Sequence, residues 1–201
     1  MTHGASGMRK GISLVEMMIA IVLLGVLSVI GYKYYKNFFD TDLVAKKARM
    51  GTVVDQASQL SSAYDVYQQQ MGTAPTLIGE LNASNVQILK ALPTMPSSVS
   101  ASWDLNVTDI GGPSAVADAV FILPLTGGAT GSITADAKKY CRVFNNMMDS
   151  SKSLTDDTSY SGQTVPQMMT TYTNAFCMDD TATPTLGTAT GLKIVFVKQL
   201  N

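Results

Sequence analysis

The side chain with the clearest potential for chemistry is the carboxyl group of Glu16, which interrupts an apolar run from Ile12 to Gly31. An ionisable group inside an apolar segment of membrane length is costly, and such a group is by default a candidate functional residue. The run contains no other charged side chain. We therefore expect Glu16 either to find a cation outside this segment or to remain protonated.

The apolar run has the length and the flanks of a membrane-spanning helix. About 20 residues at 1.5 Å each reach ~30 Å, the thickness of the hydrocarbon core of a bilayer. Arg9 and Lys10 precede the run, which predicts that its N-terminal end stays in the cytoplasm. The aromatic and basic residues of Tyr32–Lys36 follow it, and such residues are typical of a membrane interface.

Two simpler explanations account for part of this pattern. A secretory signal peptide would carry a small-residue cleavage site after its apolar core, but here the run leads directly into Tyr32. A plain membrane anchor explains the run and its flanks, but it does not explain Glu16. Gly11 instead stands before the run.

The string from Gly11 to Glu16, followed by an apolar run, resembles the class III leader junction of type IV pilins and related pseudopilins. The sequence likeness covers about residues 9–40. It implies that a prepilin peptidase cuts after Gly11 and methylates the new amino terminus on Ile12. It also implies that Glu16 neutralises the amine of a neighbouring subunit during assembly. Such a pair sets the register, because a buried charge without its partner costs ~3–5 kcal/mol.

This sequence departs from the common pilin pattern in two ways. The first mature residue is Ile12 rather than phenylalanine, and no proline occurs from residue 12 to residue 71. The glycines of this stretch are Gly25, Gly31 and Gly51, and glycine costs about 1 kcal/mol in a helix interior. Gly25 and Gly31 are the expected places for the helix to loosen. They either loosen the helix when it packs in a filament or allow close helix approach. Met8 is an alternative start to Met1.

The spacing of apolar side chains predicts the helices and strands that position these residues. Residues 43–71 show apolar side chains at spacings of 3, 4 and 7, which predict one face of a helix. A helix from residue 12 to residue 71 would be ~90 Å long, and the alternative is two helices with a hinge near 37–42. The expected organisation is a leader (1–11), a membrane or filament-core helix (12–36), its amphipathic half (37–72) and a globular head (73–201). The polar side chain of Lys46 is expected to point away from the apolar face.

The head is expected to be an α+β domain with an antiparallel sheet packed on the long helix. Residues 103–108 alternate apolar and polar side chains, which predicts a half-buried strand. The predicted strands are residues 103–108, 119–123 and 192–200, and the predicted helices are residues 84–92 and 136–148.

Two cysteines, Cys141 and Cys177, fit one disulfide if the head reaches an oxidising compartment. The pilin resemblance implies this pairing, since a C-terminal region bounded by a disulfide is a feature of the family. Closing a loop of about 37 residues contributes roughly 3–4 kcal/mol in the chain-entropy model. Two free buried thiols are the alternative.

The mature chain offers no catalytic constellation, and neither a metal ion nor a cofactor is expected. The single histidine, His3, lies in the leader, so a nucleophile paired with histidine is not available. The aspartate pairs at 156–157 and 179–180 could contact calcium, but they read as solvated loops. The glycines of residues 127–131 read as a turn, since no basic residue accompanies them.

Charge argues against a nucleic-acid partner. The cleaved chain keeps 12 of the 14 Lys and Arg residues (14 minus Arg9 and Lys10) against 15 Asp and Glu, a net side-chain charge of −3. It contains no basic block of the kind that binds nucleic acid.

The resemblance therefore implies a structural protein, a type IV pilin, and not an enzyme. It would start in the inner membrane, meet the prepilin peptidase and the pilus assembly machinery, and polymerise with copies of itself into an extracellular pilus. Adhesion, aggregation, motility and mating contact are the functions of such filaments. The mature length of 190 residues, the cysteine pair and Ile12 lean toward the type IVb class. A pseudopilin of a type II secretion system, a minor or tip pilin adhesin, and a membrane-anchored enzyme or sensor are the alternatives.

Overall fold

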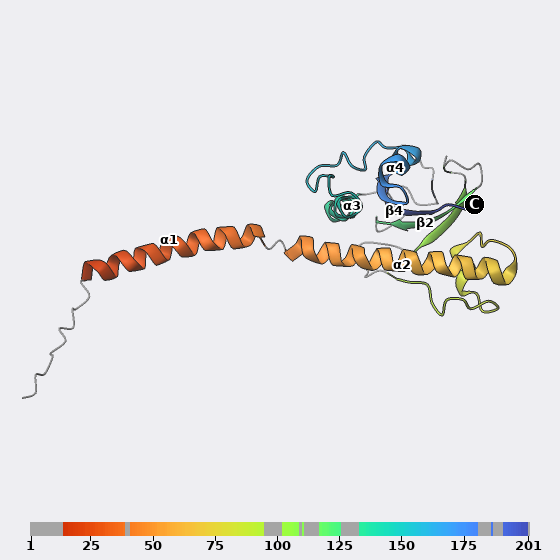
Figure 1. The fold of residues 1–201 in the computed structure, drawn as a ribbon, viewed down its shortest axis with the longest axis horizontal. Helices are drawn as coiled ribbons and strands as arrows, with labels where there is room; N and C mark the ends of the chain where they lie inside the picture. The colour runs from red at the N-terminus through yellow and green to blue at the C-terminus, as the bar shows by residue number, and fades with distance from the viewer. Residues whose placement is uncertain are drawn as a thin grey trace, which may run out of the picture. The chain divides into compact units, whose positions relative to one another are not determined.

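The computed structural model divides the chain into two units, residues 1–42 and residues 43–201, and each is described by itself. The described residues are 14–38, 41–94, 102–108, 110, 117–125, 133–180, 186 and 191–200. The elements in chain order are α1 (Leu14–Phe38), α2 (Thr41–Met71), the 3-10 helix η1 (Ile78–Asn82), β1 (Asp104–Thr108), β2 (Asp118–Pro124), α3 (Ala135–Met148), α4 (Val165–Tyr172), β3 (Ala175–Asp179) and β4 (Leu192–Lys198) (Figure 1). The predicted turn at residues 127–131 lies outside the described residues.

The helix α1 is apolar on every side. Its stretch Leu14–Lys33 is long and apolar enough to cross a membrane, and none of that stretch is buried in the protein. The helix runs through Gly25 and Gly31 without a break, and a Cβ added at either would meet no atom within 4 Å. Whether these glycines loosen the helix or admit a neighbour stays a prediction.

The helix α2 is one-sided, as its spacing predicts. One face is buried against the head while the opposite face is exposed, and its buried apolar residues are Met50, Val53, Ala57, Leu60, Ala63, Tyr64 and Tyr67. Residues 39–40 lie outside the described part of the chain. The choice between one helix from residue 12 to residue 71 and two helices with a hinge, and with it the domain boundaries, therefore stays a prediction.

The expectation for Lys46 is wrong, because its side chain is buried and only 7% exposed. Its Nζ lies 3.2 Å from Asp136 Oδ1 and 4.9 Å from the centroid of the Tyr140 ring. The apolar stem of a lysine can pack on a hydrophobic face when its charged tip meets a carboxylate or an aromatic ring. Lys46 precedes Met50 by one helical turn, so it lies on the packed face.

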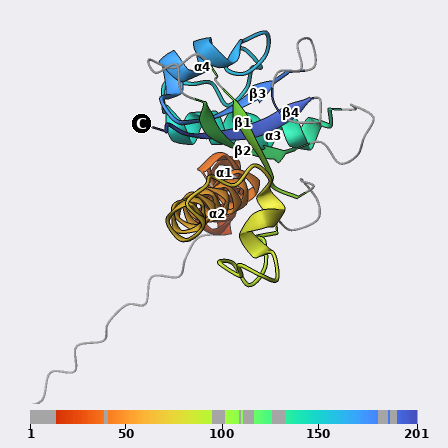
Figure 2. The ribbon, with the colours of Figure 1, turned by 90° about the vertical axis from the view of Figure 1, so that its right-hand side faces the viewer.

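The four strands form one antiparallel sheet in the order β1-β2-β4-β3. Side chains alternate between its faces, so that Phe121 and Ile122 of β2 enter different apolar clusters. The helices α2 and α3 pack on the Phe121 face, and α4 packs on the Ile122 face. Figures 1 and 2 show α2 and α4 on opposite sides of the sheet. All residues of β2 are buried, since both of its faces are covered.

Most of the predicted head elements are present, and the α+β fold is confirmed. The strands β1, β2 and β4 and the helix α3 differ from the predicted ranges by two residues or fewer at each end. Packing on both faces explains why β2 and β4 read as apolar runs rather than as alternating strands.

Three elements of the head, η1, α4 and β3, have no counterpart among the predicted ones. The helix α4 has a capping box, in which Thr164 and Gln167 satisfy backbone groups reciprocally, and a proline in its first turn. This signature is visible in the sequence. The strand β3 has only five residues, three of them buried, and so short a segment carries little periodic signal.

The predicted helix at residues 84–92 is wrong. The segment forms turns, and Gln87 has a positive φ of 43°, a conformation that ends a right-handed helix. The N–H groups of Val86 and Gln87 both donate to Ala83 O, at 3.0 and 2.8 Å. Ile88 and Leu89 nevertheless pack against the core. Apolar side chains in a short run can be buried without a helix, because a single turn is costly to nucleate.

Candidate functional site

Glu16 lies in the first turn of α1, where the helix macrodipole favours negative charge. Exposed apolar side chains surround it along the helix, including Val15, Met17 and Met18. Farther along, the Ser28 hydroxyl donates to Leu24 O at 2.7 Å, so that its hydrogen bond is made within the helix, as an apolar surrounding requires. This surface suits lipid or other apolar helices, with a carboxyl group near one end.

The cleavage junction itself, Gly11 and Ile12, lies outside the described residues. The evidence for its chemistry comes from comparison with known proteins. The model of the prokaryotic N-terminal methylation motif matches residues 7–32. The chain carries the class III signal of the type IV pilin family.

This motif makes the chain a precursor of the pilin or pseudopilin kind, anchored in a membrane by its apolar helix. It also implies processing by the peptidase and contact with the assembly machinery that such precursors share. The match ends at residue 32 and does not reach the head. No curated protein and no solved structure matched the chain.

The second predicted feature, the disulfide in the C-terminal region, is confirmed. Cys141 of α3 and Cys177 of β3 are bonded, and their Cα atoms are 5.3 Å apart. Both residues are fully buried. The bond closes a loop that contains α4 and joins the helix layer to the edge of the sheet.

Asn145 is the residue of this region that has no direct signal in the sequence. It is fully buried, one helical turn after Cys141 on α3. Its side chain accepts a hydrogen bond from the N–H of Cys177 and donates to Cys177 O and to Ser159 O. Asn145 follows Cys141 by four residues in the sequence. This spacing indicates a role for Asn145 only when the strand that contains Cys177 is known to lie beside α3.

A charged cluster fixes the loop that the disulfide encloses. The carboxylate of Asp157 accepts hydrogen bonds from Lys138 Nζ at 3.2 Å, from Arg142 Nη2 at 2.5 Å and from the hydroxyl of Tyr160. The bond from Tyr160 lowers the pKa of Asp157 most, burial opposes it, and the bonds from Arg142 and Lys138 lower it further, so that this pKa is about 2. The carboxyl group of Asp157 is therefore ionised at any physiological pH.

The two aspartate pairs considered for calcium already have protein partners. Asp157 is held by the charged cluster, and Asp156 accepts a hydrogen bond from the Thr158 hydroxyl at 2.5 Å. Asp180 is fully buried beside Lys193, which donates to it. Within the described ranges, no group of three or more His, Cys, Asp or Glu side chains is placed to hold a metal ion.

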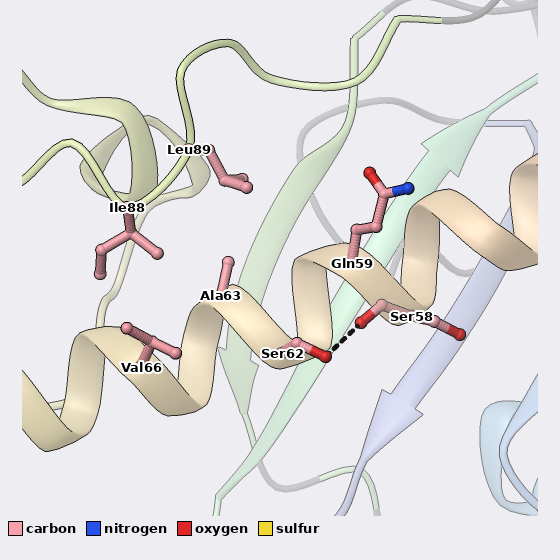
Figure 3. Close-up of a pocket in the computed structure, with 7 residues that line it drawn as sticks. All are labelled: Ser58, Gln59, Ser62, Ala63, Val66, Ile88 and Leu89. Carbon is pink, nitrogen blue, oxygen red and sulfur yellow. Dashed lines mark hydrogen bonds between the residues drawn. The ribbon is translucent and has the colours of Figure 1, made fainter.

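A shallow groove of about 430 Å³ runs along α2 (Figure 3). Ala63 of the helix points toward Leu89 across it, and the other lining residues are Ser58, Gln59, Ser62, Val66 and Ile88. The Ser62 hydroxyl donates to Ser58 O at 2.9 Å, within the helix. None of the side chains that line the groove is acidic or basic, so the groove is not equipped for acid–base chemistry.

Proposed function

We propose that this chain is a pilin, the structural subunit of a type IV pilus that is polymerised into an extracellular filament. The observation that carries the proposal is the position of Glu16. It follows Gly11 by five residues inside the matched motif, in the first turn of a helix that is apolar and exposed all around. A filament subunit needs both features, an apolar shaft and a charge that selects one position of its neighbour.

The assembly chemistry follows from cleavage after Gly11. Cleavage frees an amine on Ile12, and N-methylation leaves that amine able to carry a positive charge. Glu16 of one subunit then neutralises the amine of the next. A neighbour shifted along the helix would leave one charge buried without its partner, at a cost of ~3–5 kcal/mol. The pair thus selects the register.

Before assembly, residues 12–36 of the precursor cross the inner membrane. Arg9 and Lys10 hold the leader on the cytoplasmic side, where the positive-inside rule places them. The head then faces the oxidising side of the membrane, and the Cys141–Cys177 disulfide supports this orientation because such bonds persist outside the cytoplasm. Adhesion, aggregation, motility and mating contact are the uses that such a filament serves.

The disulfide also favours a pilin over a pseudopilin of a type II secretion system, since the resemblance associates a disulfide-bounded head with pilins. A minor pilin at the filament tip shares the same N-terminal motif. Abundance separates these roles, because a major pilin forms the bulk of the filament while the other two do not.

Filaments sheared from cells and analysed by mass spectrometry test the proposal. We expect an abundant band of this chain whose N-terminal residue is N-methylated Ile12. A trace amount in the same preparation would assign a minor or tip role. A chain that stays in the membrane fraction and retains Met1 or Met8 would overturn the proposal in favour of an anchored enzyme or sensor.

A further inference from the structure

The helix α3 directs two side chains, one helical turn apart, at the same residue of β3. Side chains at i and i+4 lie on one face of a helix, and Cys141 and Asn145 have this spacing. The sulfur of Cys141 is bonded to Cys177. The carboxamide of Asn145 binds the backbone of Cys177: the N–H of Cys177 donates to Oδ1 at 2.7 Å, and Nδ2 donates to Cys177 O at 2.9 Å.

These two hydrogen bonds replace the backbone hydrogen bonds that a neighbouring strand would make with Cys177. β3 lies at the edge of the sheet, with β4 on its inner side, and an edge strand directs alternate N–H and C=O groups outward. Asn145 satisfies both outward groups of Cys177. Two residues farther along, the N–H of Asp179 donates to Tyr160 O at 3.2 Å. The outer edge of β3 is therefore bonded to the protein without a fifth strand.

The amide of Asn145 also reaches a third segment. Nδ2 donates to Ser159 O at 3.1 Å, so both amide hydrogens and the amide oxygen are used. Ser159 and Cys177 both belong to the stretch that follows α3. One fully buried side chain thus holds together the helix, the loop and the strand that the disulfide encloses. None of these bonds involves a sulfur atom, so each can form while both cysteines are still thiols.

We infer that Asn145 is a positioning residue for disulfide formation, because it docks β3 on α3 and raises the effective concentration of one thiol at the other. Oxidation begins when the thiolate of one cysteine attacks a disulfide oxidant, breaks its S–S bond, forms a mixed disulfide and releases one half of the oxidant as a thiolate. The second thiolate then attacks the sulfur of the first cysteine and releases the remaining half of the oxidant as a thiol. Two protons and two electrons pass from the cysteine pair to the oxidant. Asn145 acts on the second, intramolecular step.

The full chain in detergent micelles, equilibrated with mixtures of reduced and oxidised glutathione, tests this role. Free thiols are alkylated and counted by mass spectrometry, which gives the equilibrium constant for closing the Cys141–Cys177 bond. In Asn145→Leu, which keeps a similar volume without polar groups, we expect this constant to fall about tenfold, the equivalent of about 1.4 kcal/mol. In Asn145→Ser, whose hydroxyl replaces part of the amide, we expect a smaller fall.

Thr134→Ala is the matched control. Thr134 caps the N-terminus of the same helix, where its Oγ1 accepts the N–H of Ala137 at 3.1 Å, and it makes no contact with Cys177 in this role. Loss of this hydrogen bond weakens α3, but we expect the equilibrium constant for closing the Cys141–Cys177 bond to stay unchanged. An unchanged constant in Asn145→Leu and Asn145→Ser, or an equal fall in Thr134→Ala, overturns the inference. Should the leucine variant fail to fold, the serine variant decides between these outcomes.

Discussion

A carboxyl group in the first turn of α1 has opposite effects in the two surroundings proposed for this helix. In lipid, Glu16 is an expensive residue that an ordinary anchor would not keep. Beside the amine of another subunit, the same group completes a charge pair. One side chain thus disfavours the isolated subunit and favours the assembled one. We propose that this asymmetry gives the residue a role in assembly that hydrophobicity alone cannot provide.

Glu16→Gln separates the charge from the size of the side chain. We expect the peptidase still to cut after Gly11, because the junction is intact, and we expect filament yield to fall at least ~100-fold, since an unpartnered amine costs ~3–5 kcal/mol. Sheared filaments, quantified in cells without a wild-type copy, measure the yield. Ser28→Ala, on the same helix, is the control and should assemble normally. Normal fibres from the glutamine variant would contradict the charge-pair mechanism.

Asp157→Asn tests the charged cluster of the head. The pKa of Asp157 falls from 3.8 to about 2 on folding, so its stabilising contribution is complete above about pH 4 and is lost as the pH falls through 2. The carboxylate is 34% exposed, and after allowance for solvent screening we expect the variant to lose about 1–2 kcal/mol at pH 7. Urea unfolding of the full chain in detergent measures this.

The way in which the free energy of unfolding changes with pH provides a control for this prediction. The stabilities of the wild-type protein and Asp157→Asn should converge as the pH falls through 2, because the carboxyl group of Asp157 then becomes protonated and neutral. A difference that persists unchanged from pH 7 to pH 2 would mean that the asparagine disturbs packing rather than charge.

Among the elements, the connection from α4 to β3 stores backbone strain at Thr173. Thr173 adopts φ 67° and ψ −77°, and the N–H of Asn174 donates to Tyr172 O at 2.8 Å. This is a γ-turn of the rare kind with positive φ. The strain lets the chain reverse at once, so that Cys177 arrives at the edge of the sheet a few residues after the helix ends.

Thr173→Gly should relieve this strain. A non-glycine residue in such a conformation costs of order 1–3 kcal/mol, and glycine returns part of that as extra freedom of the unfolded chain. We expect a net gain of about 0.5–2 kcal/mol in the free energy of unfolding by urea denaturation. Thr173→Ala keeps a Cβ and should show no such gain. Equal effects of glycine and alanine would show that the turn is not strained at this residue.

The elements also show what the sequence can and cannot predict. Most strands and helices of the head and the cysteine pair were predictable, because their signals are local or tied to a motif, whereas the role of Glu16 stays a prediction. Residues 84–92 carry apolar side chains but no local drive to form a helix. The burial of Lys46 and the bonds of Asn145 depend on Asp136, Tyr140 and Cys177, which are brought near only by the folded head. The spacing of apolar residues along the sequence gives no information about such partners.

At the scale of the whole molecule, the buried cores and the apolar surface belong to different units. Among the described residues, every buried core residue lies in residues 43–201, while most of the exposed large apolar side chains lie in α1. We expect a fragment of residues 41–201 to remain a folded monomer in buffer without detergent, whereas the full chain requires detergent. Analytical ultracentrifugation and circular dichroism check this. Aggregation of the fragment would mean that the head exposes a sticky surface of its own.

The uniform surface of α1 has a further consequence. A helix that is apolar on one stripe gains free energy by leaving water, but α1 is apolar all around, and lipid tails are as apolar as the side chains of a sibling helix. Moving α1 from the bilayer into a bundle of identical helices therefore transfers it between two apolar surroundings and releases little free energy. In the proposed filament, close packing and the Glu16 pair would therefore hold the subunits together, and we expect a subunit to return to the bilayer at a modest cost in free energy.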